Sequence, residues 1–136
     1  MSGILLDTNV LLDVLTDDPV WADWSLAQME RWALKGRLIV NAVIYAETSI
    51  GFKRIEDLDR ALAQAGVVMA EIPRPALFLA GKAYMAYRAR GGRKAGVLPD
   101  FFIGAHAAVA AWPLLSRDVG RYRTYFPSLE VIAPPK

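Results

Sequence analysis

The chain has 136 residues, 54% hydrophobic and 22% charged, a composition typical of one globular domain with an apolar core. No apolar run reaches the ~18 to 20 residues of a membrane-spanning helix, and the first residues lack the pattern of a secretion signal, a basic segment followed by an apolar stretch and a small-residue cleavage site. Cysteine is absent, which excludes disulfides and thiolate ligands and leaves oxygen donors or the single His106 for any metal. We therefore expect a soluble, cytoplasmic protein that forms a single domain over residues 1–136.

The net charge of +2 hides an uneven distribution along the chain. Residues 1–73 contain six Lys or Arg against eleven Asp or Glu, net −5, whereas residues 74–136 contain ten against three, net +7. If the basic half forms one surface, it would attract a polyanion such as nucleic acid. Charges separated in sequence can equally be mixed in the fold, so the sequence leaves both interpretations open.

In the first half of the chain, strand-like and helix-like patterns alternate. The apolar run 4–6 predicts a buried strand that ends at Asp7. The patterns that follow predict a helix over 10–15, a helix over 20–34 that ends at Gly36, a strand over 38–40, and a helix that Asn41 caps and that extends to residue 50.

The same alternation continues in the second half. The patterns predict a helix over 56–65 that ends at Gly66, a strand over 67–72, a helix over 76–88, an Ala-rich helix over 100–111, a strand over 114–115 and a last strand over 129–132. Such alternation is typical of an α/β fold. We expect a mostly parallel central sheet of four to five strands flanked by helices on both faces.

Four acidic residues occupy positions that are unusual for an acid. Asp7 and Asp118 follow predicted strands directly, Glu47 lies on an apolar stripe of its helix with Ile44 and Ile50, and Asp100 begins a helix. In open α/β sheets the carboxyl ends of the strands form the ligand crevice, so the four acids are expected to converge there. Carboxylates gathered in this way repel one another unless a cation lies among them, and oxygen-only ligands favour Mg²⁺ or Mn²⁺.

Each acid also has a purely structural interpretation. Asp7 caps the next helix, Asp100 is a favourable charge in a first turn, and Asp118 is a turn residue. Glu47 can pair with a buried Lys or Arg. His106 lies in the Ala-rich helix, where a packed histidine is more common than a catalytic one.

The motifs together resemble PIN-domain ribonucleases, and most closely the VapC-type toxins of bacterial and archaeal toxin-antitoxin pairs. The segments that carry the resemblance are residues 5–13 (LLDTNVLLD), Glu47 in its helix, residues 98–107 (LPDFFIGAHA), and residues 114–118 (LLSRD) with Tyr125-Phe126-Pro127. They follow the family order over essentially the whole chain. The resemblance implies a three-layer α/β/α PIN fold and a Mg²⁺-dependent endoribonuclease, the toxic component of a type II system.

The resemblance also implies roles for individual residues. Asp7, Glu47, Asp100 and Asp118 would form the catalytic cluster, and Asp7, Asp100 and Asp118 would bind Mg²⁺, with Mn²⁺ as an alternative. Asn9 and Ser116 would support the carboxylates by hydrogen bonds. The candidate residues for the RNA backbone are Arg88, Arg90, Arg93, Lys94, Arg117, Arg121 and Arg123.

The expected partners are RNA, a VapB-like antitoxin and a second copy of the chain. Trp21, Trp24 and Trp32 lie in one predicted helix, where they would form a protein interface or fill the core. Two other functions stay open: a housekeeping PIN nuclease that processes RNA without an antitoxin, and a non-catalytic interaction module. The sequence does not identify the RNA that is cut or the number of metal ions.

Overall fold

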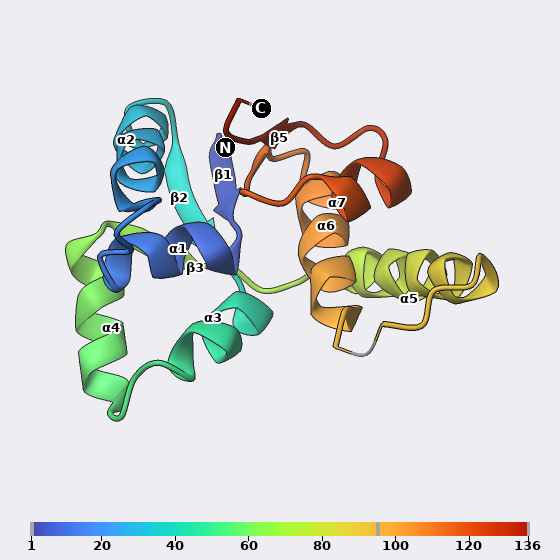
Figure 1. Ribbon diagram of the computed structural model, residues 1–136, viewed down its shortest axis with the longest axis horizontal. Helices are drawn as coiled ribbons and strands as arrows, with labels where there is room; N and C mark the ends of the chain where they lie inside the picture. Colours follow the sequence, from blue (N-terminus) through green and yellow to red (C-terminus); the bar gives the residue numbers. More distant parts are fainter. Residues whose placement is uncertain (1, 95, 136) are drawn as a thin grey trace.

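The computed structural model describes residues 2–94 and 96–135, which form one sheet with helices on either side (Figure 1). The strands are β1 (Gly3–Leu6), β2 (Arg37–Val40), β3 (Val67–Met69), β4 (Leu114–Leu115) and β5 (Val131–Ile132). The helices are α1 (Thr8–Leu15), α2 (Ala22–Ala33), α3 (Ala42–Ser49), α4 (Ile55–Gln64), α5 (Arg74–Ala89), α6 (Leu98–Ala110) and α7 (Gly120–Tyr125). None of the helices in the described ranges is long and apolar enough to cross a membrane.

The five strands pair in the order β3-β2-β1-β4-β5, and each neighbouring pair runs parallel. Figure 1 shows α1, α2 and α4 on one side of the strands and α5, α6 and α7 on the other. The predicted three-layer α/β/α architecture is therefore confirmed, and the sheet has the larger of the two strand numbers that were expected.

The central position of β1 determines where a ligand can approach. β1 pairs with β2 on one side and with β4 on the other, so the strand order reverses direction at the β1–β4 boundary. In open parallel sheets such a boundary leaves a crevice at the carboxyl ends of the two strands. The residues that follow β1 and β4 in the sequence therefore meet at this edge of the sheet.

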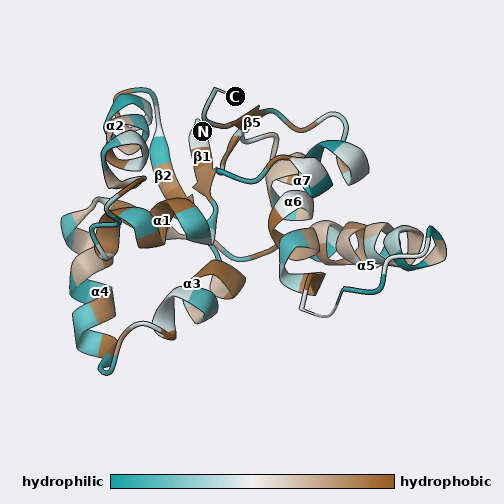
Figure 2. Cartoon of the chain, in the orientation of Figure 1, coloured by the Kyte–Doolittle hydropathy of each residue, from teal (hydrophilic) through white to brown (hydrophobic). Residues whose placement is uncertain are grey.

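The strands are buried on both faces, which explains their continuous apolar runs. Leu5, Leu6 and Ile39 are fully buried, as are both residues of β4. Figure 2 shows hydrophobic colours along β1 and the lower part of β2, whereas α2 carries hydrophilic residues on its outer surface. Burial of these strands fixes the positions of the loops that leave them.

Several element boundaries differ from the prediction. β3 and β5 are shorter than expected, because Val68 and Met69 are already exposed at the edge of the sheet and β5 contains only two residues. The apolar stripe predicted on α3 is wrong at its end, since Ile50 caps the helix and is 86% exposed. Gly66 ends α4 as predicted, with the positive φ of 71° that glycine adopts without strain.

The helix α7 was not predicted, and its packing depends on a glycine in α6. A Cβ atom added at Gly104 would lie 2.5 Å from the Phe126 ring and 3.0 Å from the Tyr122 ring. Both aromatic side chains are buried against α6. The missing side chain at Gly104 thus allows α7 to approach α6 closely, and this approach brings Tyr122 to the carboxyl edge of β1.

Candidate active site

The four predicted acids lie around the carboxyl ends of β1 and β4. Asp7 directly follows β1 and caps α1, whereas Asp118 lies in the loop after β4. Asp100 is in the first turn of α6, and Glu47 lies on α3. Their charges interact: Glu47 and Asp118 both raise the pKa of Asp100, and Asp100 raises that of Asp7. The fold therefore brings together the four acids that the sequence singles out.

Asp7 is the most buried of the four, with an exposed fraction of 5%. Burial raises its pKa to about 6, against the opposing effect of hydrogen bonds from Ser116 and Tyr122. The Ser116 hydroxyl donates to Oδ2 over 2.8 Å, the Tyr122 hydroxyl donates to the same oxygen over 2.9 Å, and the Thr8 N–H donates to Oδ1 over 2.8 Å. All three donors are neutral groups, so none of them brings a positive charge that would offset the negative charge of the ionised carboxylate.

Asp100 has a different environment because it contacts a cation. Nη1 of Arg121, in α7, donates to Oδ2 of Asp100 over 2.5 Å. Burial nevertheless raises the pKa of Asp100, with the charges of Glu47 and Asp118 adding to the effect of burial and that of Arg121 opposing it. The repulsion within the cluster thus persists even with one arginine beside it.

Glu47 is held by a residue from the first motif. The Thr8 hydroxyl donates to Oε1 of Glu47 over 2.6 Å, which ties α3 to the start of α1. Thr8 also carries the N–H that binds Asp7. One residue therefore positions two of the four carboxylates relative to each other.

Ser116 links the loops that follow β1 and β4. Its hydroxyl is buried, donates to Asp7, and accepts a hydrogen bond from the Asp118 N–H over 3.0 Å. Asn9 supports the same loop, because its Nδ2 lies 3.4 Å from the Ser116 hydroxyl and its Oδ1 accepts from the Arg117 N–H over 3.2 Å. Ser116 thus contacts a carboxylate of the cluster directly, whereas Asn9 contacts Ser116 and Arg117, and the supporting role of both residues at a metal site stays a prediction.

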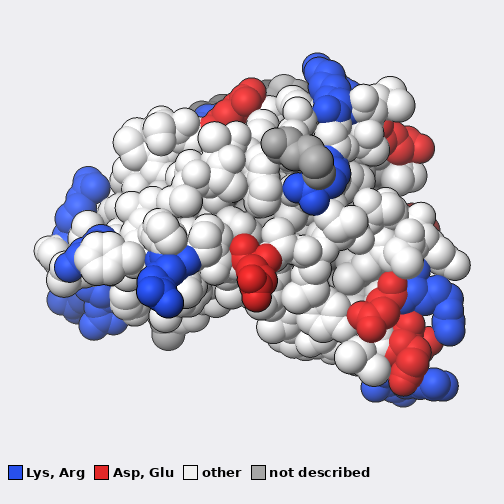
Figure 3. All heavy atoms as spheres, turned by 180° about the vertical axis from the view of Figure 1, so that it is seen from behind, with Lys and Arg blue, Asp and Glu red and all other residues white. Residues whose placement is uncertain are grey.

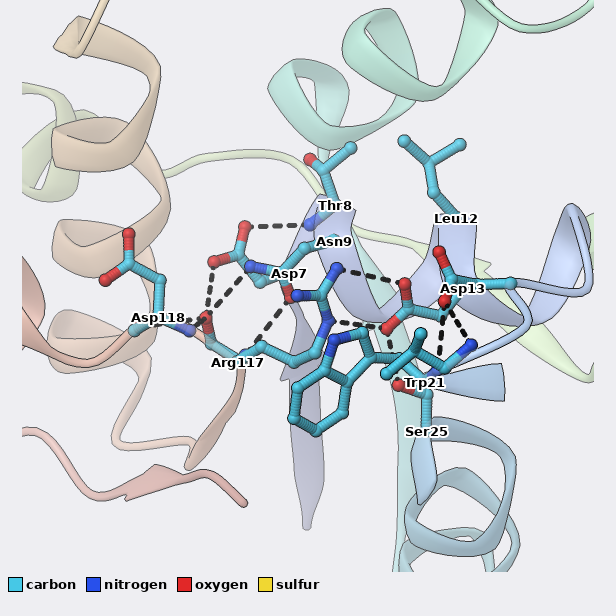
Figure 4. Close-up of polar contacts among 12 residues, drawn as sticks. Asp7, Thr8, Asn9, Leu12, Asp13, Trp21, Ser25, Arg117 and Asp118 are labelled. Atoms are coloured by element: carbon cyan, nitrogen blue, oxygen red, sulfur yellow. Dashed lines mark hydrogen bonds and ion pairs between the residues drawn. The ribbon is translucent and has the colours of Figure 1, made fainter. Parts of the chain in front are cut away.

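The side chain of Arg117 turns away from the acids and into a clamp between α1, α2 and the loop after β4 (Figure 4). Nε donates to Oδ2 of Asp13 over 2.7 Å and Nη2 donates to Oδ1 over 3.0 Å. Asp13 is buried and also accepts from the Ser25 hydroxyl, while the Trp21 ring lies 5.1 Å from the guanidinium. The guanidinium is therefore occupied by Asp13 and does not face outward as a ligand for an RNA backbone.

The candidate RNA-binding cations fall into two groups. Arg117 and Arg121 are paired with carboxylates. The others lie in exposed positions at or beyond the end of α5 or on α7: Arg88, Arg90, Arg93, Lys94 and Arg123. Figure 3 shows Lys and Arg side chains gathered at the left-hand end of that view, where the end of α5 lies.

His106 is buried and has a structural partner, as the sequence predicts. Its Nδ1 lies 3.1 Å from Nδ2 of Asn41, whose Oδ1 accepts from the Ile44 N–H at the start of α3. Burial lowers the pKa of His106 and so favours the neutral imidazole. The pair links α6, which carries Asp100, to the helix that carries Glu47.

The three tryptophans of the second helical segment are half-buried and do not form an exposed aromatic face. Trp24 and Trp32 pack against the core, and Trp21 stacks edge-on with Trp24 at 6.3 Å between ring centroids. Exposed large apolar side chains are more frequent on α5, which carries three of them at Leu77, Phe78 and Met85. The structure supports the core interpretation for Trp24 and Trp32, whereas Trp21 contacts Trp24 and the Arg117 guanidinium.

Three residues of the site have contacts that sequence reasoning missed: Thr8, Asp13 and Tyr122. The burial of Asp13 could have been predicted, since it lies three residues after Val10 on the inward face of α1. A buried acid needs a partner. Its partner Arg117 is 104 residues away in the sequence. Tyr122 gave no signal, because α7 itself was not predicted.

The donor chemistry of the cluster suits a divalent cation. Asp7 supplies a buried carboxylate with neutral partners, and the other acids add negative charge and oxygen atoms around it. In the described ranges, no three acidic or histidine side chains stand close enough together to enclose an ion as they are. Glu47 and Asp100 instead bind Thr8 and Arg121, so the carboxylates fit a metal by chemistry, whereas their present spacing is wider than an ion requires.

The model of one family, the PIN domain, matches residues 4–127. The chain belongs to the PIN domain family. The match includes every acid of the cluster and the loop that carries Ser116. Membership supports a nuclease in general terms. No curated protein matches the chain.

Solved structures confirm that the whole PIN domain fold is present. A chain of VapBC2 from Rickettsia felis bound to a promoter DNA fragment has a TM-score of 0.76 and 17% identity, covering 98% of this chain and 99% of that one. A chain of VapBC-1 from nontypeable Haemophilus influenzae has a TM-score of 0.71 and 21% identity, covering 96% and 97%. A chain of FitAcB from Neisseria gonorrhoeae has a TM-score of 0.67 and 19% identity, covering 94% and 95%.

Proposed function

We propose that this PIN domain is a Mg²⁺-dependent endoribonuclease and the toxic component of a VapBC-like type II toxin-antitoxin system. The observation that carries the proposal is the set of four electrostatically coupled acids at the β1–β4 edge, with ionised Asp7 buried among neutral donors. The cluster has the oxygen-only chemistry that Mg²⁺ or Mn²⁺ prefers. The likeness to chains of toxin-antitoxin complexes supports the choice of biological system.

Asp7, Asp100 and Asp118 are the proposed metal ligands, and Glu47 completes the catalytic cluster. The bound ion would offset charge on the scissile phosphate and make an attacking water more acidic. The protein's own groups fix the carboxylates: Ser116 and Tyr122 hold one oxygen of Asp7 toward the loop after β4, and Thr8 holds Glu47 beside α1. Cleavage by water would leave 5′-phosphate and 3′-hydroxyl ends.

A polymer substrate agrees with the shape and charge of the molecule. A cavity of about 300 Å³ lies at the opposite edge of the sheet, between Trp32, Lys35 and Trp112, and the acids lie outside it. The exposed cations at the end of α5 would bind the RNA backbone by charge, which does not depend on the RNA sequence. The proposed substrate is therefore RNA, held between the basic end and the acidic edge.

The proposed partners are a VapB-like antitoxin and a second copy of the chain. The helix α5 exposes Phe78 to 68% and Met85 to 56%, and Leu77 is also exposed. Exposed apolar side chains of this size on one helix are typical of surfaces that contact another protein.

The proposal is tested by brief induction of the protein in a bacterial host, followed by sequencing of RNA 5′ ends. We expect growth arrest and new 5′-phosphate ends at defined sites with the wild type, and neither with Asp100→Asn. The same new ends in both strains would contradict the proposed catalytic role of Asp100.

Co-expression with the neighbouring open reading frame separates the toxin from a housekeeping nuclease. We expect the neighbour to restore growth and to co-purify with the protein. Cleavage without growth arrest, and without any effect of the neighbour, would favour the RNA-processing alternative.

A further inference from the structure

Arg121 occupies one of the proposed metal ligands. Its Nη1 lies 2.5 Å from Oδ2 of Asp100, and both side chains are partly exposed, Arg121 at 20% and Asp100 at 30%. The carboxylate that would bind a divalent ion therefore already has a positive partner inside the chain. A metal ion that uses Oδ2 must displace the guanidinium, because both cations need the same lone pairs at short distance.

The charges around Asp100 explain why a cation is found there. Glu47 and Asp118 act on Asp100 with negative charge, and Arg121 opposes them. Arg121 thus partly neutralises the negative charge of the cluster, as a divalent ion would. A divalent ion carries twice the charge and binds several oxygens at once, so it is the stronger neutraliser of such a cluster.

The contacts of Arg121 are those of a group that can move. It makes one hydrogen bond to Asp100, and its guanidinium lies 5.6 Å from the Tyr87 ring. Arg117 differs, since it makes two hydrogen bonds to buried Asp13. A guanidinium that rests on an aromatic ring can turn away from a carboxylate and keep its cation–π contact.

Tyr87 and Tyr125 lie between Arg121, which contacts Asp100, and Arg90 at the end of α5. The Tyr87 ring lies 6.0 Å from the Tyr125 ring, and the Arg90 guanidinium lies 5.6 Å from the Tyr125 ring. Arg121 and Arg90 therefore rest on neighbouring rings between the acidic edge and the end of α5. A phosphate bound beside Asp100 would lie within the field of Arg121.

We propose that Arg121 is an internal counter-cation that competes with the divalent metal for Asp100 and, once displaced, binds the phosphate of the substrate. This inference rests on the proposed metal-dependent function. Arg121 then binds Asp100 when the metal is absent and the substrate phosphate when the metal is bound. Metal binding therefore frees an arginine for the RNA. An arginine with this role lowers the affinity of the protein for the metal and raises the gain in RNA affinity that the metal produces.

The first test measures Mn²⁺ binding by isothermal titration calorimetry in the wild type, Arg121→Gln and Arg121→Lys. The matched control is Arg31→Gln, which removes an exposed arginine from α2 that is not among the candidate RNA-binding residues. We expect Arg121→Gln to bind Mn²⁺ about threefold to tenfold more tightly, since the partly exposed Arg121–Asp100 ion pair no longer competes with the metal for Asp100. Arg121→Lys, which keeps the charge, and the control should stay within about twofold of the wild type.

The second test measures binding of a 2′-O-methyl RNA oligonucleotide by fluorescence anisotropy, in EDTA and in Mn²⁺. In EDTA we expect equal affinities for the wild type and Arg121→Gln, because Arg121 is then paired with Asp100. In Mn²⁺ the wild type should gain more affinity than the variant. A merely structural role of Arg121 would not produce a difference that depends on the metal.

The outcomes separate the two proposals. Equal Mn²⁺ affinities for the wild type and Arg121→Gln, or weaker binding by the variant, would overturn the role of Arg121 and leave the proposed nuclease intact. An equal gain in oligonucleotide affinity would overturn the phosphate-binding step. A wild type that does not bind Mn²⁺ would contradict the metal dependence itself and with it both proposals.

Discussion

Asp7 combines an unfavourable buried charge with a proposed role as a metal ligand. Its carboxylate is buried among three neutral donors, and its pKa is raised to about 6 by burial. At pH 7 it is ionised in both the folded and the unfolded chain, so the shift from 3.8 costs the folded, metal-free protein about 3 kcal/mol. The proposed metal ion would offset this cost.

We predict that Asp7→Asn stabilises the metal-free protein at pH 7 by about 1–2 kcal/mol while abolishing RNA cleavage, since the amide avoids the buried charge but loses the ion-dipole part of its hydrogen bonds. Urea unfolding in EDTA measures the change, with Glu30→Gln on the exposed face of α2 as the control. Destabilisation by Asp7→Asn would contradict this account of the site.

The difference in stability between the wild type and Asp7→Asn should depend on pH in the way that the titration of Asp7 predicts. Below about pH 4 the carboxyl is protonated in both states, so the wild type has no charge to bury. As the pH rises from about 4 to about 6, only the unfolded chain loses the proton, and the stability of the wild type should fall relative to Asp7→Asn. Above about pH 6 the difference should be constant. His106, whose pKa is lowered, makes the stability of both proteins rise with pH. This contribution is the same in the wild type and Asp7→Asn, so it cancels in their difference.

The identities of the four acids could be predicted from the sequence, whereas their partners could not. Asp7 and Asp118 follow apolar runs, and that position alone places them at the carboxyl edge of a parallel sheet. The contacts of Arg117 with Asp13 and of Tyr122 with Asp7 span more than 100 residues each. Such contacts depend on loop conformations and helix packing, which local patterns do not encode.

The clamp of Arg117 and Asp13 explains how the loop after β4 keeps its conformation. Arg117 lies between Ser116 and Asp118, its backbone binds Asn9, and its side chain binds buried Asp13 on α1. The arginine therefore anchors the loop that carries the proposed metal ligand Asp118 to α1. The expectation that the arginines of the basic half contact RNA does not apply to a side chain with this partner.

We predict that Arg117→Gln destabilises the protein by about 2–3 kcal/mol, because it leaves the Asp13 carboxylate buried without a cation. Thermal unfolding measures the loss, and Arg123→Gln serves as the control for the removal of an exposed arginine. The double variant Asp13→Asn with Arg117→Gln should recover part of the lost stability. No recovery would mean that the pair is not the source of the effect.

The contact between α6 and α7 places Tyr122 on Asp7. We predict that Gly104→Ala costs about 1–3 kcal/mol, since its methyl group would overlap the rings of Phe126 and Tyr122. RNA cleavage should fall further than with Tyr122→Phe, which removes one hydrogen bond only. Gly81→Ala on α5, where a Cβ meets nothing within 4 Å, is the matched control for thermal unfolding and for activity. Unchanged stability of Gly104→Ala would contradict the packing described.

The alternation of strands and helices was sufficient to predict the layers and the parallel sheet, but it missed α7 and placed an exposed residue on the buried stripe of α3. The helix α7 has six residues, of which just Tyr122 is buried, so it lacks the repeated apolar spacing that identifies a helix. The stripe on α3 was extended one turn too far because Ile50 is apolar yet exposed. Both errors arise where tertiary packing, not local pattern, decides burial.

The exposed cations at the end of α5 lie apart from the acidic cluster, whereas at the start of α4 Arg54 and Arg60 pair with acids. The acids lie at the carboxyl edge of the sheet, and exposed cations gather at the end of α5 (Figure 3). We predict that the triple variant Arg90→Ser, Arg93→Ser, Lys94→Ser weakens oligonucleotide binding and lowers the slope of log Kd against log salt by about 1–2, since each phosphate contact on a single strand contributes about 0.7.

The control for this variant removes three cations from another part of the chain, Lys53, Arg54 and Arg60, of which the last two pair with acids at the start of α4. Their loss should leave the salt slope unchanged. Equal effects of both triple variants would show that binding follows net charge and not the basic end of the molecule.

The most direct measurement of the central claim is the cleavage rate of a defined single-stranded RNA by purified protein, titrated with Mg²⁺ and then with EDTA. For the wild type and the Glu30→Gln control we predict cleavage that depends on Mg²⁺, stops with EDTA, and leaves 5′-phosphate ends. For Asp100→Asn we predict a rate lower by at least about 100-fold at every Mg²⁺ concentration, as expected when a group that holds a catalytic metal is lost. Cleavage that continues in EDTA, or an Asp100→Asn protein as active as the wild type, would contradict the account.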